Sequence, residues 1–199
     1  MLVKTYNNII KSISHADGIA LLLLRLYLAP VMIQAGWNKA SNFSNIVEWF
    51  GNEDYGLGLP LPYLLALLAT AAELVGGILI LFGLLTRLVS IPLMVTMIVA
   101  MLSVHAKNGW LAISDASSWF ADGTLLLNER IMASPEKLAA AKSLLETHGN
   151  YDWLTSSGNF VVLNNGIEFG ATYFIMLFVL FFYGGGRYVS VDYYLTKNR

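Results

Sequence analysis

The sequence contains no cysteine, and this absence removes a whole group of redox centres. Without cysteine there is no disulfide, no thiol redox centre, no thiolate metal site and no cysteine-ligated iron–sulfur cluster. Any redox chemistry of this chain would therefore depend on a bound cofactor, a quinone or a partner chain.

Charged residues are also scarce. They make up 13% of the 199 residues, whereas hydrophobic residues make up 56%. A soluble domain usually carries about a quarter charged residues, so the composition predicts a protein that lies in a lipid bilayer. The net charge is −1 and no run of basic residues occurs, so nucleic-acid binding has no support.

Motifs of independent catalysis are missing as well. There is no Gly-x-Gly-x-x-Gly, no P-loop, no His-Glu-x-x-His and no Gly-x-Ser-x-Gly. The histidines number three, and they lie in an N-terminal tail, at a helix end and in a polar loop: His15, His105 and His148. A two-histidine haem site inside the bilayer is therefore excluded. A non-catalytic subunit of a membrane oxidoreductase is left open.

Four segments meet the requirement of roughly 20 mostly apolar residues for crossing a membrane. They cover residues 18–37, 63–84, 88–106 and 167–183. We therefore predict an all-α fold: one membrane domain over residues 1–199, built as an integral four-helix bundle. The polar segment 107–165 is predicted to be a partly helical extracytoplasmic loop.

Basic residues in short loops predict the orientation of the spans. They concentrate in the N-terminal tail, between the second and third spans, and in the C-terminal tail: Lys4, Lys11, Arg87, Arg187, Lys197 and Arg199. This bias predicts a multi-pass protein with both termini in the cytoplasm. We expect the membrane to be a bacterial inner membrane. Arg25 and Pro30 interrupt the first span, which favours a retained helix over a cleaved signal peptide.

The outer loop carries its own helix signals. Ser134, Pro135 and Glu136 predict a helix start with a serine cap and a proline in the first turn. The residues of its apolar face are Leu138, Ala141, Leu144 and Leu145. Four aromatic residues are expected to settle this loop onto the bilayer interface: Trp110, Trp119, Phe120 and Trp153.

Two ionisable residues fall at membrane depth. Arg25 lies inside the first span and Glu73 near the middle of the second. An isolated charge there costs at least about 2.5–3.5 kcal/mol, so the two are expected to form a structural ion pair that fixes the helix register. The alternatives are a proton relay and an anchor for a polar ligand.

A second polar group gathers at the outer ends of the spans. Its members are Gln34, Asn38, Lys39, His105, Asn108 and Glu168. We expect a ligand-binding site formed by Lys39, Glu73, His105 and Glu168. The alternative is interface anchoring, in which Lys39 reaches the membrane surface along its aliphatic stem.

Methionines line one stripe of the third span. Met94, Met97, Met101 and His105 recur at helical offsets. Thioether and imidazole groups together suit copper(I), which makes Met97, Met101 and His105 a candidate metal site. Methionine is also ordinary filler between helices, so packing explains the same stripe.

These features resemble the DoxX/DoxD-like family of four-helix membrane proteins. The resemblance rests on "RLYLAPVMIQAGWNKA", on "ATAAELVGGILILFGLLTRL" with its mid-membrane Glu73, on His105, and on "GGGRYVSVDYYL" with Arg187, Ser190 and Asp192. Some members are subunits or partners of redox systems such as thiosulfate–quinone oxidoreductase, and most have no defined activity. "AGWNK", "SVHAKNGW" and "LNNGIEF" are similar to a subgroup encoded beside genes for modified copper-binding peptides.

The resemblance implies an accessory component of a redox or copper-handling pathway, without a self-sufficient catalytic centre. The implied ligands and partners are a quinone, copper, a modified metal-binding peptide or a redox enzyme. A transporter for a small solute or modified peptide is the alternative, and a structural scaffold is the third possibility. The lipid bilayer is a predicted partner throughout, and a homo-oligomer stays open.

Overall fold

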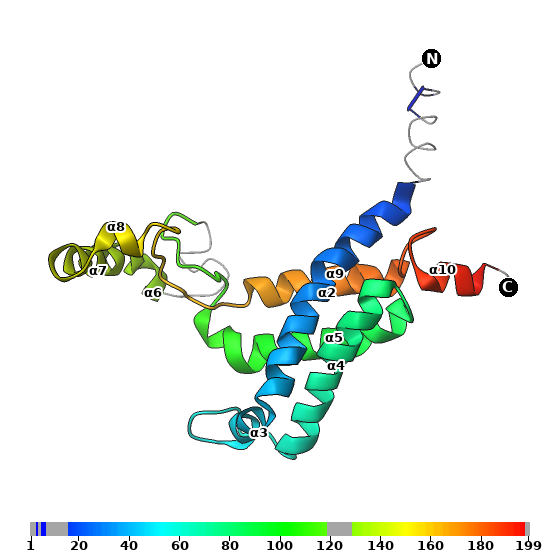
Figure 1. The fold of residues 1–199 in the computed structure, drawn as a ribbon, viewed down its shortest axis with the longest axis horizontal. Helices are drawn as coiled ribbons and strands as arrows, with labels where there is room; N and C mark the ends of the chain where they lie inside the picture. Colours follow the sequence, from blue (N-terminus) through cyan, green and yellow to red (C-terminus); the bar gives the residue numbers. More distant parts are fainter. Residues whose placement is uncertain (1–2, 4, 7–15, 119–128, 198–199) are drawn as a thin grey trace. The chain divides into compact units, whose positions relative to one another are not determined.

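The computed structural model describes residues 3, 5–6, 16–118 and 129–197 (Figure 1). Within these residues, three helical stretches are long and apolar enough to cross a membrane. They are α2 (Asp17–Ser41), α4 (Pro62–Phe82) and the stretch Thr86–Asn108. The third stretch begins as α5 (Thr86–Ala100), continues as the π-helix η2 (Met101–His105) and ends as the 3₁₀ helix η3 (Ala106–Asn108).

The fourth predicted span, residues 167–183, corresponds to a helix of nearly the same bounds, but this helix is not among the three candidates for crossing a membrane. Helix α9 (Glu168–Tyr183) has 16 residues, which reach roughly 24 Å along a helix. The hydrocarbon layer is about 30 Å thick. The all-helical prediction is confirmed, because the described residues contain no strand and only a single antiparallel bridge, Ile113 with Leu163.

The remaining helices are α3 (Phe43–Gly51), α6 (Glu129–Met132), α7 (Ser134–His148), α8 (Tyr151–Leu154) and α10 (Val191–Thr196). Some residues used for the predictions lie outside the described ones: Lys4, Lys11, His15, Trp119, Phe120 and Arg199. The chain divides into two compact units. The first comprises residues 1–98 and 173–199, and the second residues 99–172.

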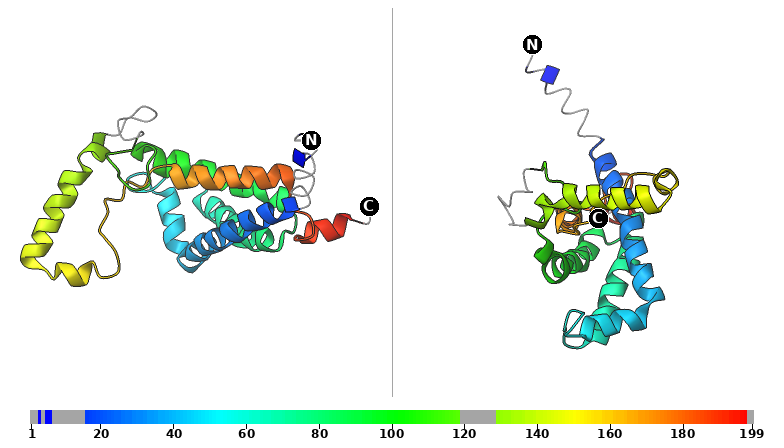
Figure 2. Two further views of the ribbon diagram at one scale, coloured as in Figure 1. Left: turned by 90° about the horizontal axis from the view of Figure 1, so that it is seen from above. Right: turned by 90° about the vertical axis from the view of Figure 1, so that its left-hand side faces the viewer.

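Helices α2 and α4 pack against each other in the first unit (Figures 1 and 2). Their approach is close because glycine lies at both sides of the contact. A Cβ on Gly36 would stand 2.7 Å from the Cα of Leu74, and a Cβ on Gly77 would stand 2.9 Å from the backbone nitrogen of Ile33. Small residues permit this backbone-to-backbone packing between helices in membranes.

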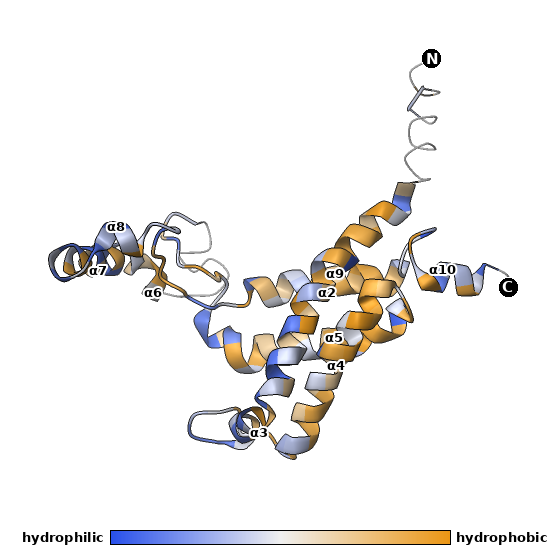
Figure 3. Cartoon of the chain, in the orientation of Figure 1, coloured by the Kyte–Doolittle hydropathy of each residue, from blue (hydrophilic) through white to orange (hydrophobic). Residues whose placement is uncertain are grey.

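The first unit is apolar both inside and outside. Its buried cluster includes Leu28, Met32, Ile80, Leu93 and Leu177. Many large apolar side chains of the same helices are exposed, among them Leu23, Tyr27, Leu68, Val75, Leu88, Val95 and Phe178. Figure 3 shows these helices in orange, and α7 and α8 in paler and bluer shades. A hydrophobic surface of this extent is typical of helices that lie in a lipid bilayer.

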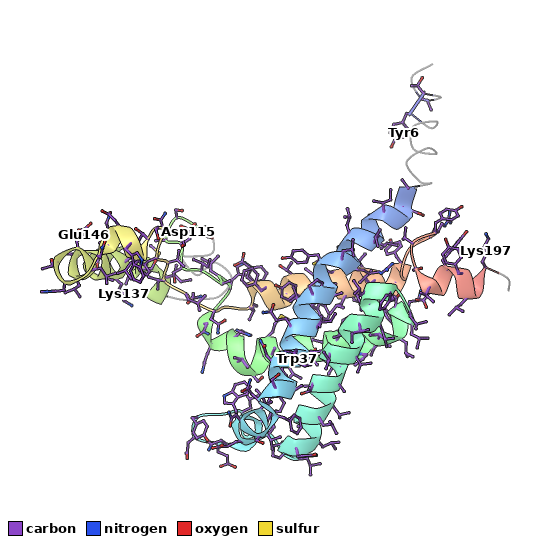
Figure 4. The ribbon with its side chains drawn as sticks, in the orientation of Figure 1. Tyr6, Trp37, Asp115, Lys137, Glu146 and Lys197 are labelled. Carbon is purple, nitrogen blue, oxygen red and sulfur yellow. The ribbon has the colours of Figure 1, made fainter. Side chains whose placement is uncertain are left out.

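In the second unit, two segments are bound together through their backbones. The amide of Gly166 donates to the carbonyl of Leu111 at 2.9 Å, and that of Glu168 donates to Trp110 at 3.0 Å. Helix α7 turns into α8 through a bend (Figure 2). Lys137 and Glu146 project from α7 in Figure 4.

Helix α7 begins at Ser134 as predicted, but the serine is not its cap. Ala133 occupies the cap position, and no side chain makes a capping hydrogen bond. The predicted apolar face is only partly covered: Leu138 and Leu145 are half-buried, whereas Leu144 is 63% exposed.

Candidate functional site

Glu73, in the middle of α4, forms an ion pair with Lys39 of α2. The distance from Lys39 Nζ to Glu73 Oε2 is 2.5 Å, and the side chains are 24% and 6% exposed, respectively. Gly36 precedes Lys39 by one helical turn and brings α2 against α4 at this level. The long aliphatic stem of lysine then carries the ammonium group to the carboxylate.

The pair retains unused hydrogen-bonding capacity. An ammonium group has three N–H donors and a carboxylate has two acceptor oxygens. Among the described residues, Lys39 donates only to Glu73, and no residue donates to Glu73 Oε1. The nearby hydroxyl of Thr70 is occupied by the carbonyl of Ala66, at 2.7 Å. The site therefore offers a donor and an acceptor side by side at membrane depth.

Arg25 does not pair with Glu73, and here the structure corrects the sequence-based expectation. Its guanidinium donates to the carbonyls of Ile80 and Leu81 at 2.9 and 2.8 Å. These carbonyls belong to the last turn of α4, where the regular helical hydrogen bonds end; the Ile80 carbonyl also accepts the amide of Gly83 at 3.0 Å. Glu73 precedes Ile80 by seven residues, which is roughly 10 Å along the helix.

The same arginine also binds the segment after α9. It donates to the carbonyls of Gly185 at 2.6 Å and Val189 at 3.0 Å. Gly83 makes room for it: this residue has φ 65°, and a Cβ there would stand 2.7 Å from Arg25 Cζ. Arg25, 1% exposed, is therefore a structural residue that joins three parts of the first unit.

Sequence reasoning missed the role of Asp192. Its carboxylate accepts the amides of Leu85 at 2.7 Å and Thr86 at 2.8 Å, and so caps the start of α5. Its own amide donates to the carbonyl of Gly83 at 2.9 Å. The sequence shows an aspartate after a glycine-rich stretch, but it does not show which distant helix that aspartate caps.

His105 and Glu168, the other two predicted ligand residues, lie in the second unit. His105 Nδ1 is 2.9 Å from the carbonyl of Asn165, and Glu168 Oε2 accepts the amide of Ala112 at 2.9 Å. Asn108 Nδ2 donates to the same Asn165 carbonyl at 3.0 Å. These bonds hold the two loop segments of that unit together.

The predicted copper ligands are also distributed over both units. Met97 is 8% exposed in the apolar core of the first unit. Met101 and His105 belong to the π-helix of the second unit, and a Cβ on Gly170 would stand 2.7 Å from Met101 Cγ. Over the described ranges, no three His, Cys, Asp or Glu residues gather as a metal site would require.

Taken together, the fold and the site define a helical membrane protein with a lysine–glutamate pair at membrane depth. Residues 20–106 match the family model described as DoxX. This segment includes α4 and α5, most of α2, and both Lys39 and Glu73.

Curated proteins similar to this chain include two bacterial sequences. The "Putative oxidoreductase CatD" of Bacillus subtilis is 33% identical over 89 residues, 45% of this chain and 62% of that protein. An "Uncharacterized protein" of Haemophilus influenzae is 31% identical over 103 residues, 47% of this chain and 62% of that protein. The chain thus spans 62% of the length of each relative. No solved structure matches it significantly.

Proposed function

We propose that this chain is an accessory membrane component of a redox pathway, in which Lys39 and Glu73 bind a quinone-class ligand. The observation that carries the proposal is that, among the residues the structure describes, a donor on Lys39 and an adjacent acceptor on Glu73 have no partner. A quinone carbonyl accepts a hydrogen bond, and the hydroxyl of the reduced quinol donates one. The pair can therefore hold either form.

The position of the pair suits a ligand that is dissolved in the membrane. Lys39 is a quarter exposed, so its ammonium group is reached from outside the helix contact. The pair also lies inside the segment that matches the DoxX model, and one similar protein carries the word oxidoreductase in its name. With no cysteine in the sequence, an accessory role is favoured over independent catalysis.

The proposal includes a topology. In it, α9 is the fourth span of a four-helix bundle in a bacterial inner membrane, and both termini are cytoplasmic. Two arginines support this topology because they lie at the same end of the first unit. Arg87 lies close to Gly184, and Arg187 lies close to Gly18. Basic residues on one end of a membrane protein favour the cytoplasmic side.

Quinone binding is tested with the purified protein in detergent, using a short-chain quinone as the probe. Wild type should bind it, whereas Glu73→Gln and Lys39→Met should each bind it at least roughly tenfold more weakly, since a hydrogen bond to a charged group contributes about 1.5–3 kcal/mol. A solvent-exposed pair on α7, Lys142 with Glu146 at 3.7 Å, supplies the matched control. Glu146→Gln should leave binding unchanged.

Copper(I) and transport are tested in the same preparations. Copper(I) binding that depends on Met101 and His105, without quinone binding, would replace the quinone proposal by a copper-handling role. Flux of a solute through proteoliposomes that Glu73→Gln abolishes would replace it by transport. Failure of the wild type to bind the quinone would refute the proposed ligand.

A further inference from the structure

A cleft of about 910 Å³ opens at one end of the first unit. Three segments meet there: the start of α2, the turn between α4 and α5, and the segment between α9 and α10. The contacts of Arg25 and Asp192 described above hold these segments together. All three candidate membrane spans begin or end at these segments, as expected for a cleft at the boundary between membrane and water.

The walls of the cleft are amphipathic. Leu21, Leu88 and Phe182 form an apolar part, and the latter two are 62% and 59% exposed. Arg87, Arg187, Tyr183 and Tyr193 form a polar part. Tyrosine is enriched where a membrane protein passes through the headgroup layer. This composition suits a ligand with a polar head and an apolar tail.

The charged groups around the cleft differ in how well they are paired. Arg187 Nε lies 3.9 Å from Asp17 Oδ2. Asp192 is bound by the amides of Leu85 and Thr86, and Arg25 lies behind the cleft on the Gly185 carbonyl.

Arg87 is the exception. Its guanidinium forms no hydrogen bond or ion pair within the described part of the chain, and it lies beside Gly184, where a Cβ would stand 3.3 Å from Arg87 Nε. The residues that line the cleft include two arginines, Arg87 and Arg187, and two aspartates, Asp17 and Asp192. Asp17 faces Arg187, and Asp192 is held by two backbone amides, so neither carboxylate pairs with Arg87 in the described part of the chain.

We infer that the cleft binds the phosphodiester headgroup of an anionic phospholipid. Arg87 is the main ligand of the phosphate, because guanidinium groups bind phosphate oxygens in bidentate fashion and this one has no partner among the described residues. An acyl chain lies along Leu88 and Phe182. The apolar wall favours a lipid over free phosphate.

The inference is tested with the full-length protein in detergent. Phosphatidylglycerol, phosphatidylcholine with the same acyl chains, and inorganic phosphate are added separately. Native mass spectrometry measures the retained lipid, and the apparent Tm measures stabilisation. Phosphatidylglycerol should be retained and should raise the Tm, whereas the other two should not. An equal shift with phosphatidylcholine, or with inorganic phosphate alone, would overturn the proposal.

Variants assign the binding to the cleft. Arg87→Gln should weaken phosphatidylglycerol retention roughly fivefold or more, and Arg87→Lys, which keeps the charge but not the fork of donors, should lie in between. Lys137→Gln, which removes an exposed charge from α7, should retain lipid like wild type. Circular dichroism checks the helix content of each variant. If Arg87→Gln does not fold, the lipid retention of Arg87→Lys decides whether Arg87 binds the headgroup. Wild-type retention in a folded Arg87 variant would sink the proposal.

Discussion

The backbone amide of Thr86 donates to the carboxylate of Asp192 at 2.8 Å, across 106 positions of sequence. The neighbouring amide of Leu85 donates to the other carboxylate oxygen at 2.7 Å. Leu85 has φ 52°, a left-handed conformation that is unfavourable for a leucine. The aspartate thus holds the α4–α5 turn in a conformation that its own sequence does not favour.

Replacing Asp192 should therefore destabilise the membrane unit. We expect Asp192→Ala to lower the free energy of unfolding by about 1–2 kcal/mol, the range for loss of a helix cap. Asp192→Asn, which keeps one acceptor oxygen, should have a smaller effect. Unfolding in detergent measures both. Asp54→Ala, at an exposed position, is the control, and an effect of Asp192→Ala no larger than that of the control would contradict the capping role.

The partner of Glu73 can be established by double-mutant cycles. We expect a coupling free energy of about 0.5–3 kcal/mol between Lys39→Met and Glu73→Gln, as for residues in direct contact. Arg25→Leu should be additive with Glu73→Gln within about 0.5 kcal/mol, because the two residues share no partner. Arg25→Leu alone should cost about 3 kcal/mol or more, since it removes four hydrogen bonds from a charged group to backbone carbonyls. Strong coupling between Arg25 and Glu73 would restore the pairing predicted from sequence.

Helix contact at Gly36 sets the geometry of the Lys39–Glu73 pair. We expect Gly36→Ala to destabilise the first unit by about 1–3 kcal/mol, because the added methyl group would press on the backbone of α4. Ligand binding at the pair should weaken in parallel. Ala71→Val, which enlarges an exposed position of α4, serves as the control. Equal unfolding free energies for Gly36→Ala and wild type would show that the helices can separate without cost.

The register between α2 and α4 explains why sequence reasoning chose the wrong basic residue. Hydropathy located the three longer spans because membrane thickness fixes their length. It also showed that Glu73 needs a partner, and Arg25 and Lys39 both lie on α2. Gly36 lies opposite Leu74, which places Lys39 beside Glu73 and Arg25 beside Ile80. No residue pattern in a single sequence reports this offset.

The polar cluster around His105 shows a second limit. The sequence predicted a ligand-binding site that includes His105 and Glu168, and in the structure each side chain has a hydrogen-bond partner within the protein. Both partners are backbone groups, the carbonyl of Asn165 and the amide of Ala112. Backbone carbonyls and amides occur all along the chain. The sequence therefore does not show which of them binds a given side chain.

Asp115 provides a test of pH dependence outside the membrane spans. Ser117 donates its hydroxyl at 2.6 Å and its amide at 2.9 Å to Asp115 Oδ1, and these bonds lower the pKa of the Asp115 carboxyl below its ordinary value of 3.8. The loop is therefore stabilised above that value, and the stabilisation is lost as the pH falls through the lowered pKa.

Removing the serine hydroxyl should reverse part of this shift. We expect Ser117→Ala to raise the pKa of Asp115 toward its ordinary value, measured by carboxyl-carbon NMR of aspartate-labelled protein. Ser156→Ala, whose hydroxyl donates to the Trp153 carbonyl at 2.8 Å, should leave it unchanged. An unaltered Asp115 titration in Ser117→Ala would assign the shift to the backbone amide instead.

Thr86 carries a buried hydroxyl that the protein does not use. Its side chain is 0% exposed, and Thr86 Oγ1 has no hydrogen-bond partner among the described residues. Burying an unsatisfied hydroxyl costs about 1–3 kcal/mol, whereas an apolar group of the same shape avoids that cost. We therefore expect Thr86→Val to keep or raise the free energy of unfolding.

Ser90→Ala, one turn later, is the control and should lower the free energy of unfolding by about 1 kcal/mol, since the Ser90 hydroxyl donates to the Thr86 carbonyl at 2.8 Å. A loss of stability in Thr86→Val as large as that in Ser90→Ala would show that the Thr86 hydroxyl does find a partner, such as a buried water, in the folded protein.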